Sequence, residues 1–233
     1  MTALSGRHAV QEALNAKIPL KELWVASHMQ KSYQDLIQQA ASLKVPVKYV
    51  SEKELNLIHE KHQHVIAMAS AVKQGSLQAL IQDKPKVVVM LDHLQDPHNM
   101  GAIIRTCVGL GIQHLIYPKD RNAGISSGVI RASAGAVYLM NLIQVVNLAN
   151  TLQTLSKEGY WVYATHVEKG KALHQSKPAF PLVLIVGNEE KGISQRLLNL
   201  ADEYLTIPMS GSWDSLNVSV ATGIMLYHLV TQP

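Results

Sequence analysis

Three segments of the chain follow an apolar run with polar side chains that could bind a ligand or stabilise charge. In the first, Asn99 and Arg105 come after the run 87–91. Amide groups position ligands by hydrogen bonds, and a guanidinium stabilises negative charge. A strand that leads through Pro97 into a helix presents both side chains near its carboxyl end, where open α/β sheets bind ligands. The ordinary alternatives are a helix cap for Asn99 and a surface ion pair for Arg105.

The second segment ends the apolar run 182–186 at Gly187, and the carboxylate of Glu189 follows. A glycine at the end of a strand lets a ligand approach the backbone closely. The alternative is a tight turn between strand and helix whose charges are solvated.

The third segment, residues 207–221, connects a predicted strand to the C-terminal helix. It is too polar to be core, and it contains Gly211 as well as Ser215 and Asn217. The alternative is that Asp214 or Ser215 serves only as the cap of that helix.

Other motifs have simpler explanations. Residues 124–128 match the Gly-x-Ser-x-Gly pattern of hydrolases, but the polar residues 119–123 separate them from the preceding strand, so a loop and helix start is favoured. Dinucleotide-binding and P-loop fingerprints are missing from the sequence. Cys107 lies in an apolar helical stretch, which favours a buried thiol over a nucleophile.

Three histidines, His59, His62 and His64, have a spacing that metal ligands on a helix or loop can have. No cysteine or aspartate nearby supports a metal site. The sequence therefore favours a solvated turn that leads into a strand at Val65, with RNA contact as a lesser alternative.

Continuous apolar runs from Lys86 onward are the strands that must hold the three segments. Separated by helical patterns, such runs predict a parallel sheet that is buried on both faces. The predicted strands are 87–91, 114–117, 161–164, 182–186 and 204–207.

Residues 1–74 alternate short helical and strand patterns, which predicts a small separate α/β unit. Residues 75–85 are the expected linker, with one or two helical turns, before a larger domain at 86–233. Strands are expected at 23–26 and 65–72, and helix starts at Ser5, at Ser32 with Asp35, and at Ser51 with Glu54.

The composition limits the class of protein. The 233 residues are 47% hydrophobic and 16% charged, which suits a folded chain with a packed core. A single cysteine excludes an internal disulfide, and with no signal peptide in view we expect a cytoplasmic protein. No apolar run approaches the roughly 20 residues that span a bilayer. The net charge of +4 weakly favours a polyanionic partner, while 5% aromatic residues argue against stacking bases on rows of rings.

Together, residues 91–106, 183–194 and 207–221 resemble the three signature motifs of the SpoU family, also called the TrmH family, of RNA ribose 2'-O-methyltransferases in the SPOUT superfamily. The resemblance extends from Lys86 to the C-terminus, and residues 4–14 look like the start of the family's L30e-like RNA-binding domain. It implies an α/β fold in which a small L30e-like domain precedes a parallel-sheet SPOUT domain with a trefoil knot. His64 departs from the pattern, since the family often has glycine there.

The resemblance also implies a site that uses S-adenosylmethionine as cofactor, RNA as partner and a homodimer, without a metal, a membrane or DNA. The implied catalytic and RNA-facing residues are Asn99, Arg105, Glu189, Ser215 and Asn217. The implied cofactor-binding residues are Gly187, Ile207 and Leu216, with Asn188, Met209 and Thr165 as further candidates.

The members most similar in arrangement methylate a guanosine ribose of bacterial 23S rRNA. We therefore expect Arg105 to stabilise a developing alkoxide, Ser215 and Asn217 to position the nucleotide, and Glu189 to orient Arg105 or the ribose. The alternatives are a tRNA ribose methyltransferase and an RNA-binding protein of the same fold without activity.

Overall fold

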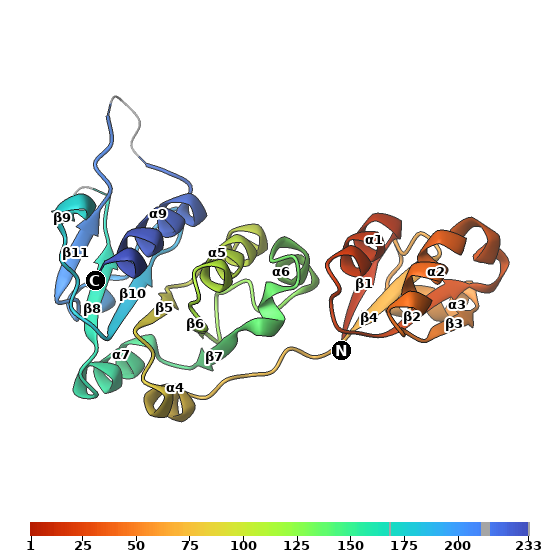
Figure 1. The fold of residues 1–233 in the computed structure, drawn as a ribbon, viewed down its shortest axis with the longest axis horizontal. Coiled ribbons are helices and arrows are strands. Elements are labelled where there is room, and N and C mark those ends of the chain that lie inside the picture. The colour runs from red at the N-terminus through yellow and green to blue at the C-terminus, as the bar shows by residue number, and fades with distance from the viewer. Residues whose placement is uncertain (168, 211–214, 233) are drawn as a thin grey trace.

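The computed structural model describes residues 1–167, 169–210 and 215–232. Figure 1 shows two α/β units that follow each other along the chain, the N-terminal unit in red and orange and the C-terminal unit mostly in green and blue. Both units consist of a sheet with helices packed on it, as the sequence predicts. The trefoil knot that the resemblance implies stays a prediction.

The N-terminal unit contains four short strands and the helices between them. Its elements are β1 (Thr2–Ser5), α1 (Arg7–Asn15), β2 (Leu20–Ala26), the 3-10 helix η1 (Ser27–Tyr33), α2 (Gln34–Ser42), β3 (Val47–Val50), α3 (Glu52–Ile58) and β4 (Val65–Ala69). The strand order is β1-β4-β2-β3, in which β4 runs antiparallel to both neighbours and β2 runs parallel to β3. The carboxyl ends of β2 and β3 therefore meet the amino end of β4 at one edge.

The C-terminal unit is built on a larger sheet whose strand pairings are all parallel. Its order is β7-β6-β5-β10-β8-β11-β9, which places β10 between β5 and β8. The elements are α4 (Leu77–Asp83), β5 (Val87–Leu91), α5 (Pro97–Gly109), β6 (His114–Pro118), α6 (Ser127–Ala132), η2 (Ala136–Leu139), β7 (Asn141–Val145), α7 (Leu148–Lys157), β8 (Trp161–Thr165), β9 (Lys171–Ala172), η3 (Leu173–Gln175), β10 (Leu182–Val186), α8 (Gln195–Leu198), β11 (Glu203–Thr206) and α9 (Val218–Thr231).

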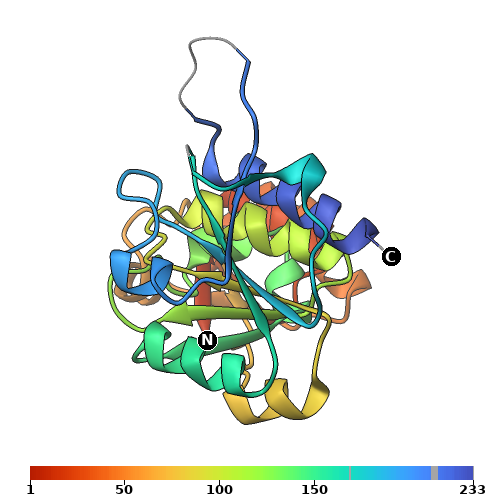
Figure 2. The same ribbon diagram turned by 90° about the vertical axis from the view of Figure 1, so that its left-hand side faces the viewer.

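Helices cover both faces of this sheet, as Figure 2 shows. Successive side chains of a strand point to opposite faces, so Val89 of β5 packs in a core with α5, α6 and α9, whereas Val88 packs with α4, α7 and α8. Both side chains are fully buried. Two-sided burial explains why β5 and β10 are continuous apolar runs, and it confirms the parallel sheet predicted from them.

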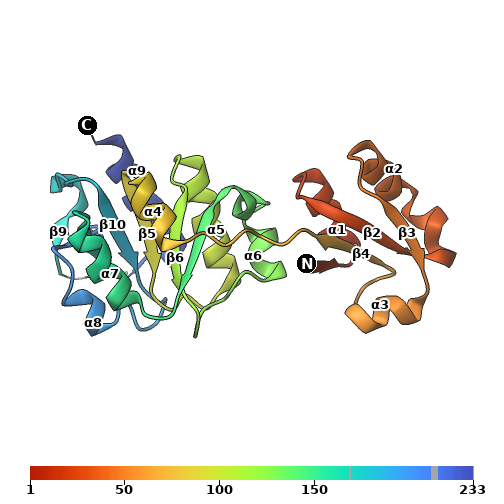
Figure 3. The same cartoon turned by 90° about the horizontal axis from the view of Figure 1, so that it is seen from below.

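The linker contacts the C-terminal unit before it reaches β5, and Figure 3 shows it running between the two units. The N–H of Gly75 donates to the carbonyl of Leu142 in β7 (2.8 Å), and the buried Leu80 of α4 belongs to the core under β5. The units also touch directly, because the Tyr138 hydroxyl donates to the carbonyl of Ser70 (2.9 Å).

One of the three predicted helix starts in the N-terminal unit is confirmed. Ser51 and Glu54 form a reciprocal capping box at α3. The prediction at Ser5 is wrong, since Ser5 belongs to β1 and Gly6 precedes α1. The prediction at Ser32 is also wrong, because the carboxylate of Asp35 accepts a hydrogen bond from Arg7 (2.6 Å) instead of completing a cap.

Cys107 and the Gly-x-Ser-x-Gly motif have structural roles, as the sequence favours. Cys107 is fully buried in α5, and burial raises the pKa of its thiol to about 12. Ser126 caps α6 by accepting from the N–H of Val129 (3.4 Å). Among the described residues, no helix is long and apolar enough to cross a membrane.

Candidate functional site

The three polar segments meet at the carboxyl edge of the large sheet. The strands β5, β10, β8 and β11 are adjacent and parallel, so the residues that follow them lie along the same edge. Asn99 follows β5 on α5, Gly187 follows β10, Thr165 ends β8 and Ile207 follows β11. This is the edge at which open parallel sheets bind ligands.

Asn99 connects the three segments by two hydrogen bonds. Its Nδ2 donates to Oε1 of Glu189 in the second segment (2.9 Å), and its Oδ1 accepts from Nδ2 of Asn217 in the third (3.0 Å). The side chain is buried, with 8% of its surface exposed, whereas Glu189 and Asn217 are exposed. Because Asp96 caps α5, the interpretation of Asn99 as its cap is wrong.

Asn217 serves two partners at once. Its Oδ1 caps α9 by accepting from the N–H of Ser219 (2.9 Å), while its Nδ2 donates to Asn99. The predicted caps Asp214 and Ser215 are not the observed cap, and Asp214 lies outside the described residues. A cap alone could be aspartate or serine, but the donor to Asn99 requires the amide.

The loop after β10 closes tightly on itself. Asn188 pairs with Gly192 through two backbone hydrogen bonds of 3.0 Å, and its Nδ2 donates to the carbonyl of His93 (3.0 Å). A Cβ at Gly187 would lie 2.4 Å from the carbonyl carbon of Gly192. The glycine therefore accommodates the backbone of its own loop, which corrects the expectation that it simply leaves room for a ligand.

Asp92 is a residue that the sequence analysis missed. It lies directly after β5 with 2% of its surface exposed, and its carboxylate accepts from the N–H of Ser194 (2.7 Å) and contacts Nδ1 of His93 (2.5 Å). It thereby ties the loop after β10 to the end of β5. A buried carboxylate of this kind needs such partners to offset its lost hydration. A charged residue at the end of an apolar run is the signal that could have identified it.

Arg105 and Ser215 do not take part in the hydrogen bonds that join Asn99, Glu189 and Asn217. Both are exposed, and neither side chain makes a hydrogen bond or ion pair with another described residue. Arg105 is six residues from Asn99 on α5, which is about 120° around the helix, so the two side chains leave on different faces. The alternative of a surface ion pair for Arg105 therefore has no partner within the described chain. Glu189 contacts Asn99 and Asn188, not Arg105.

The remaining candidates for cofactor binding lie at the ends of β8 and β11 and in the segment between β11 and α9. Ile207 packs partly buried against the core, Leu216 and Thr165 are half-buried, and Met209 is exposed. Side chains of this kind suit the faces of an adenine ring, while the ends of β8, β10 and β11 offer backbone groups for its polar edges.

Two family descriptions match the chain. Residues 86–227 match the SpoU rRNA Methylase family, and residues 3–75 match the family described as RNA 2'-O ribose methyltransferase substrate binding. The two matches fall on the units built around the large and the small sheet.

Individual relatives match nearly the whole of this chain. The chain is 33% identical to a putative TrmH family tRNA/rRNA methyltransferase of Staphylococcus haemolyticus, over 96% of this chain and 93% of the relative. It is 38% identical to an uncharacterized tRNA/rRNA methyltransferase of Synechocystis, over 98% of this chain but only 62% of that protein.

A solved structure extends the likeness to the fold. The AdoMet-bound rRNA methyltransferase of Sinorhizobium meliloti superposes with a TM-score of 0.70 at 26% identity, covering 98% of this chain and 86% of that one. With the family match over more than half of its residues, the chain belongs to the SpoU (TrmH) family of RNA methyltransferases.

Proposed function

We propose that this protein transfers the methyl group of S-adenosylmethionine to the ribose 2'-hydroxyl of a guanosine in 23S rRNA. The observation that carries the proposal is the network Glu189–Asn99–Asn217, which joins the three segments of the family resemblance at the ligand-binding edge of the sheet. Relatives are named for both tRNA and rRNA, so the choice of rRNA rests on the separate N-terminal unit and the resemblance alone.

The residues at the sheet edge fit S-adenosylmethionine. Ile207, Leu216 and Met209 supply apolar surface for the adenine, and the strand ends at Thr165 and Gly187 supply backbone groups. The cofactor brings a methyl group already activated on a sulfonium, so the protein contributes orientation and electrostatics. Transfer leaves a neutral thioether and releases the proton of the 2'-hydroxyl.

Protein groups would position the reacting ribose and stabilise its oxygen. Glu189, held by Asn99 and Asn188, orients the ribose through hydrogen bonds, and Ser215 and Asn217 position the nucleotide. Arg105 stabilises negative charge on the 2'-oxygen as the proton leaves. Because Arg105 does not reach Glu189 in this chain, the orienting role of Glu189 concerns the ribose in our proposal.

A second copy of the chain is the proposed partner for α9. This helix buries Met225, Leu226 and Leu229, yet Val220, Ile224 and Tyr227 on another face are 50%, 42% and 63% exposed. A helix that is apolar all round is normally buried all round. A homodimer through α9 would cover that face.

The N-terminal unit, residues 1–74, is proposed to recruit the RNA, and the protein is proposed to act in the cytoplasm. Phosphate contacts by its lysines and arginines would make RNA affinity fall steeply with added salt.

The test of function combines binding and mapping. Calorimetry should show S-adenosylmethionine binding to the purified protein, and ribose methylation should be mapped in rRNA and tRNA from a strain that lacks the gene. We expect one guanosine of 23S rRNA to lose its 2'-O-methyl group. Loss in tRNA instead would replace the substrate, and a protein that ignores the cofactor at millimolar concentration would be an RNA-binding protein without this activity.

Asn217→Asp separates the structural from the functional role of Asn217. Aspartate caps helices as well as asparagine does, so α9 and the stability of the fold should be nearly unchanged. The donor to Asn99 is lost, and we expect methyl transfer to fall roughly 10-fold, the equivalent of about 1.4 kcal/mol or one hydrogen bond. Circular dichroism, urea unfolding and single-turnover methylation measure the three quantities. Unchanged methylation would leave Asn217 as a cap only.

A further inference from the structure

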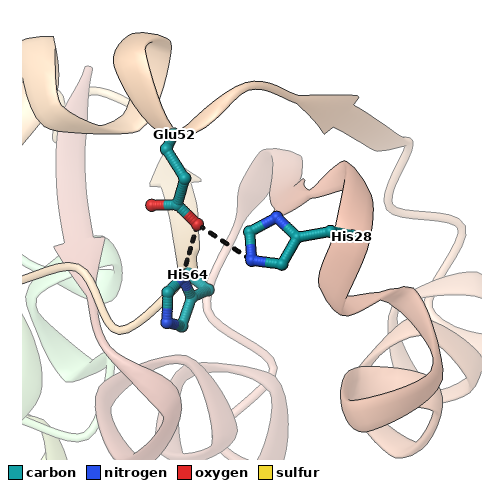
Figure 4. A group of neighbouring side chains, drawn as sticks. All are labelled: His28, Glu52 and His64. Carbon is teal, nitrogen blue, oxygen red and sulfur yellow. Dashed lines mark hydrogen bonds and ion pairs between the residues drawn. The ribbon is translucent and has the colours of Figure 1, made fainter.

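A cluster of histidines and one glutamate lies in the N-terminal unit, far along the chain from the methyltransferase site. His28 is on η1 just after β2, Glu52 begins α3 just after β3, and His64 directly precedes β4. Since the carboxyl ends of β2 and β3 meet the amino end of β4, the three side chains come together at one edge of the small sheet. Figure 4 shows both imidazoles turned toward the carboxylate.

The spacing of the three side chains suits a small cation. One nitrogen or oxygen atom from each residue lies within 4.8 Å of those from the other two. Nε2 of His28 is 3.5 Å from Oε1 of Glu52, and Nδ1 of His64 contacts the same oxygen. Ligands of a tetrahedral zinc ion, at about 2.0–2.2 Å from the metal, are about 3.3–3.6 Å apart. The direct contact of His64 with Glu52 must open by about 1 Å to admit the ion.

His62 contacts the other oxygen of the Glu52 carboxylate. It is 4% exposed, so the solvated turn expected from the sequence is wrong for this histidine, whereas His59 is exposed as expected. Its Nδ1 accepts from the backbone N–H of His64 (2.9 Å), so its proton is on Nε2, which faces Oε2 of Glu52 (3.4 Å) and Oδ1 of Asn56 (3.1 Å). Metal-binding carboxylates are commonly oriented by such hydrogen bonds to the oxygen that does not bind.

The backbone that presents His64 is strained and firmly held. Gln63 and His64 have φ values of 48° and 61°, in the left-handed region that favours glycine. The Tyr33 hydroxyl donates to the carbonyl of Gln63 (2.5 Å), and the N–H of Ala26 donates to the carbonyl of His64 (2.9 Å). Strained residues that a structure holds in place are concentrated at ligand-binding sites.

We propose that His28, Glu52 and His64 form a zinc site, in which Nε2 of His28, Oε1 of Glu52 and Nδ1 of His64 bind Zn²⁺ and a water is the fourth ligand. Two imidazoles and one carboxylate with an open position are a donor set that Zn²⁺ takes. The ion displaces the proton that His64 shares with Glu52. It would fasten η1, α3 and the turn before β4 to one another. The inference does not rest on the proposed methyl transfer.

The experiment titrates the full-length chain, without an affinity tag, with Zn²⁺ by calorimetry and with Co²⁺ by visible absorption. We expect one Zn²⁺ per chain and the intense spectrum of tetrahedral Co²⁺. His28→Ala and Glu52→Gln should each weaken Zn²⁺ binding at least about 100-fold, because even outer partners of a metal site are worth 10- to 100-fold. His28 is the safer change for folding, since its only described ion pair is with Glu52 and its side chain is 59% exposed.

His59→Ala is the matched control. His59 is a neighbouring histidine whose Nδ1 already accepts from the N–H of Lys61 (3.1 Å), so its loss should leave Zn²⁺ affinity unchanged. The proposal is overturned if the parent protein binds Zn²⁺ no more tightly than His28→Ala does, or if His59→Ala weakens binding as much as the two site variants. Methylation activity does not enter either outcome, so a failure here is separate from a failure of the proposed function.

Discussion

Gly187→Val is expected to weaken binding of S-adenosylmethionine by about 5- to 150-fold and to lower the stability of the C-terminal unit. A Cβ at this position would lie 2.4, 2.5 and 2.7 Å from the backbone of Gly192 and Ile193, distances that no rotamer can relieve. The loop must move, and its ties from Asn188 to His93 and from Glu189 to Asn99 move with it. Overpacking of a tight site costs about 1–3 kcal/mol. Where this cost falls on the cofactor-bound state, it weakens the affinity for the cofactor by about 5- to 150-fold.

Gly109→Ala is the control for this change. Gly109 is the last residue of α5, and a Cβ there meets no atom within 4 Å. Its stability should be unchanged or slightly raised, because alanine is the better helix former. Isothermal calorimetry and urea unfolding compare the variants. Normal cofactor affinity in Gly187→Val would mean that the loop after β10 does not form the cofactor site.

The strands of the large sheet were predictable to the extent that they are buried on both faces. The run 182–186 is β10 and the run 87–91 is β5, because two-sided burial makes every position apolar. The same rule missed β7 (Asn141–Val145), which is an edge strand with Asn141 and Gln144 exposed. Leu142 and Ile143 are buried on opposite faces of β7, but polar exposed residues flank them, so the apolar run is too short to predict a strand.

The pairings inside the candidate site were beyond sequence reasoning from local patterns. Asn99 bonds to Glu189 and Asn217, which are 90 and 118 residues away along the chain. Only the order of strands in the sheet brings them together, and periodicity does not contain that order. The resemblance to a family identified these residues as a set, whereas the structure shows which atoms connect them.

In the smaller unit, the cluster around Glu52 also forms from residues that are far apart in the sequence. His62 and His64 were visible as neighbours in sequence, but His28 and Glu52 join them only because β2, β3 and β4 share an edge. The sequence pattern around the histidines therefore did not identify Glu52 as the carboxylate of a metal site. His62, whose Nε2 faces Oδ1 of Asn56 on α3 (3.1 Å), is likewise buried only in the folded unit.

For Arg105 the alternatives are a role in catalysis and a surface ion pair, and the structure shows no ion pair among the described residues. It is exposed and unpaired among the described residues, so removing its side chain should change the free energy of unfolding by no more than about 0.5 kcal/mol. It is on α5 beside α9, where a Cβ at Gly223 would lie 3.7 Å from Thr106. In a dimer formed through α9, this face of α5 would lie near the partner's surface, so Arg105 can serve either its own site or the partner's.

We expect Arg105→Ala to lose methyl transfer by on the order of 100- to 1,000-fold, the cost of one preorganised donor to a developing oxyanion. Cofactor affinity should be unchanged, because the candidate cofactor residues follow β8, β10 and β11 rather than lie on α5. Arg105→Lys should recover only part of the rate, since an ammonium does not reproduce the planar fork of donors. Lys157→Ala, which removes a positive charge at the end of α7, is the control for net charge.

Single-turnover methylation beside cofactor titration is the measurement for these variants. Co-expression of Arg105→Ala with Glu189→Gln then decides whose site Arg105 completes. If Arg105 serves the partner, each single variant lacks one element of both sites, but a mixed dimer regains one intact site and a fraction of the parental rate. If it serves its own subunit, the mixture has no site with both residues and stays inactive. Near-normal chemistry in Arg105→Ala alone would remove Arg105 from the reaction, because a guanidinium that contributes nothing to the rate cannot be stabilising charge on the ribose oxygen.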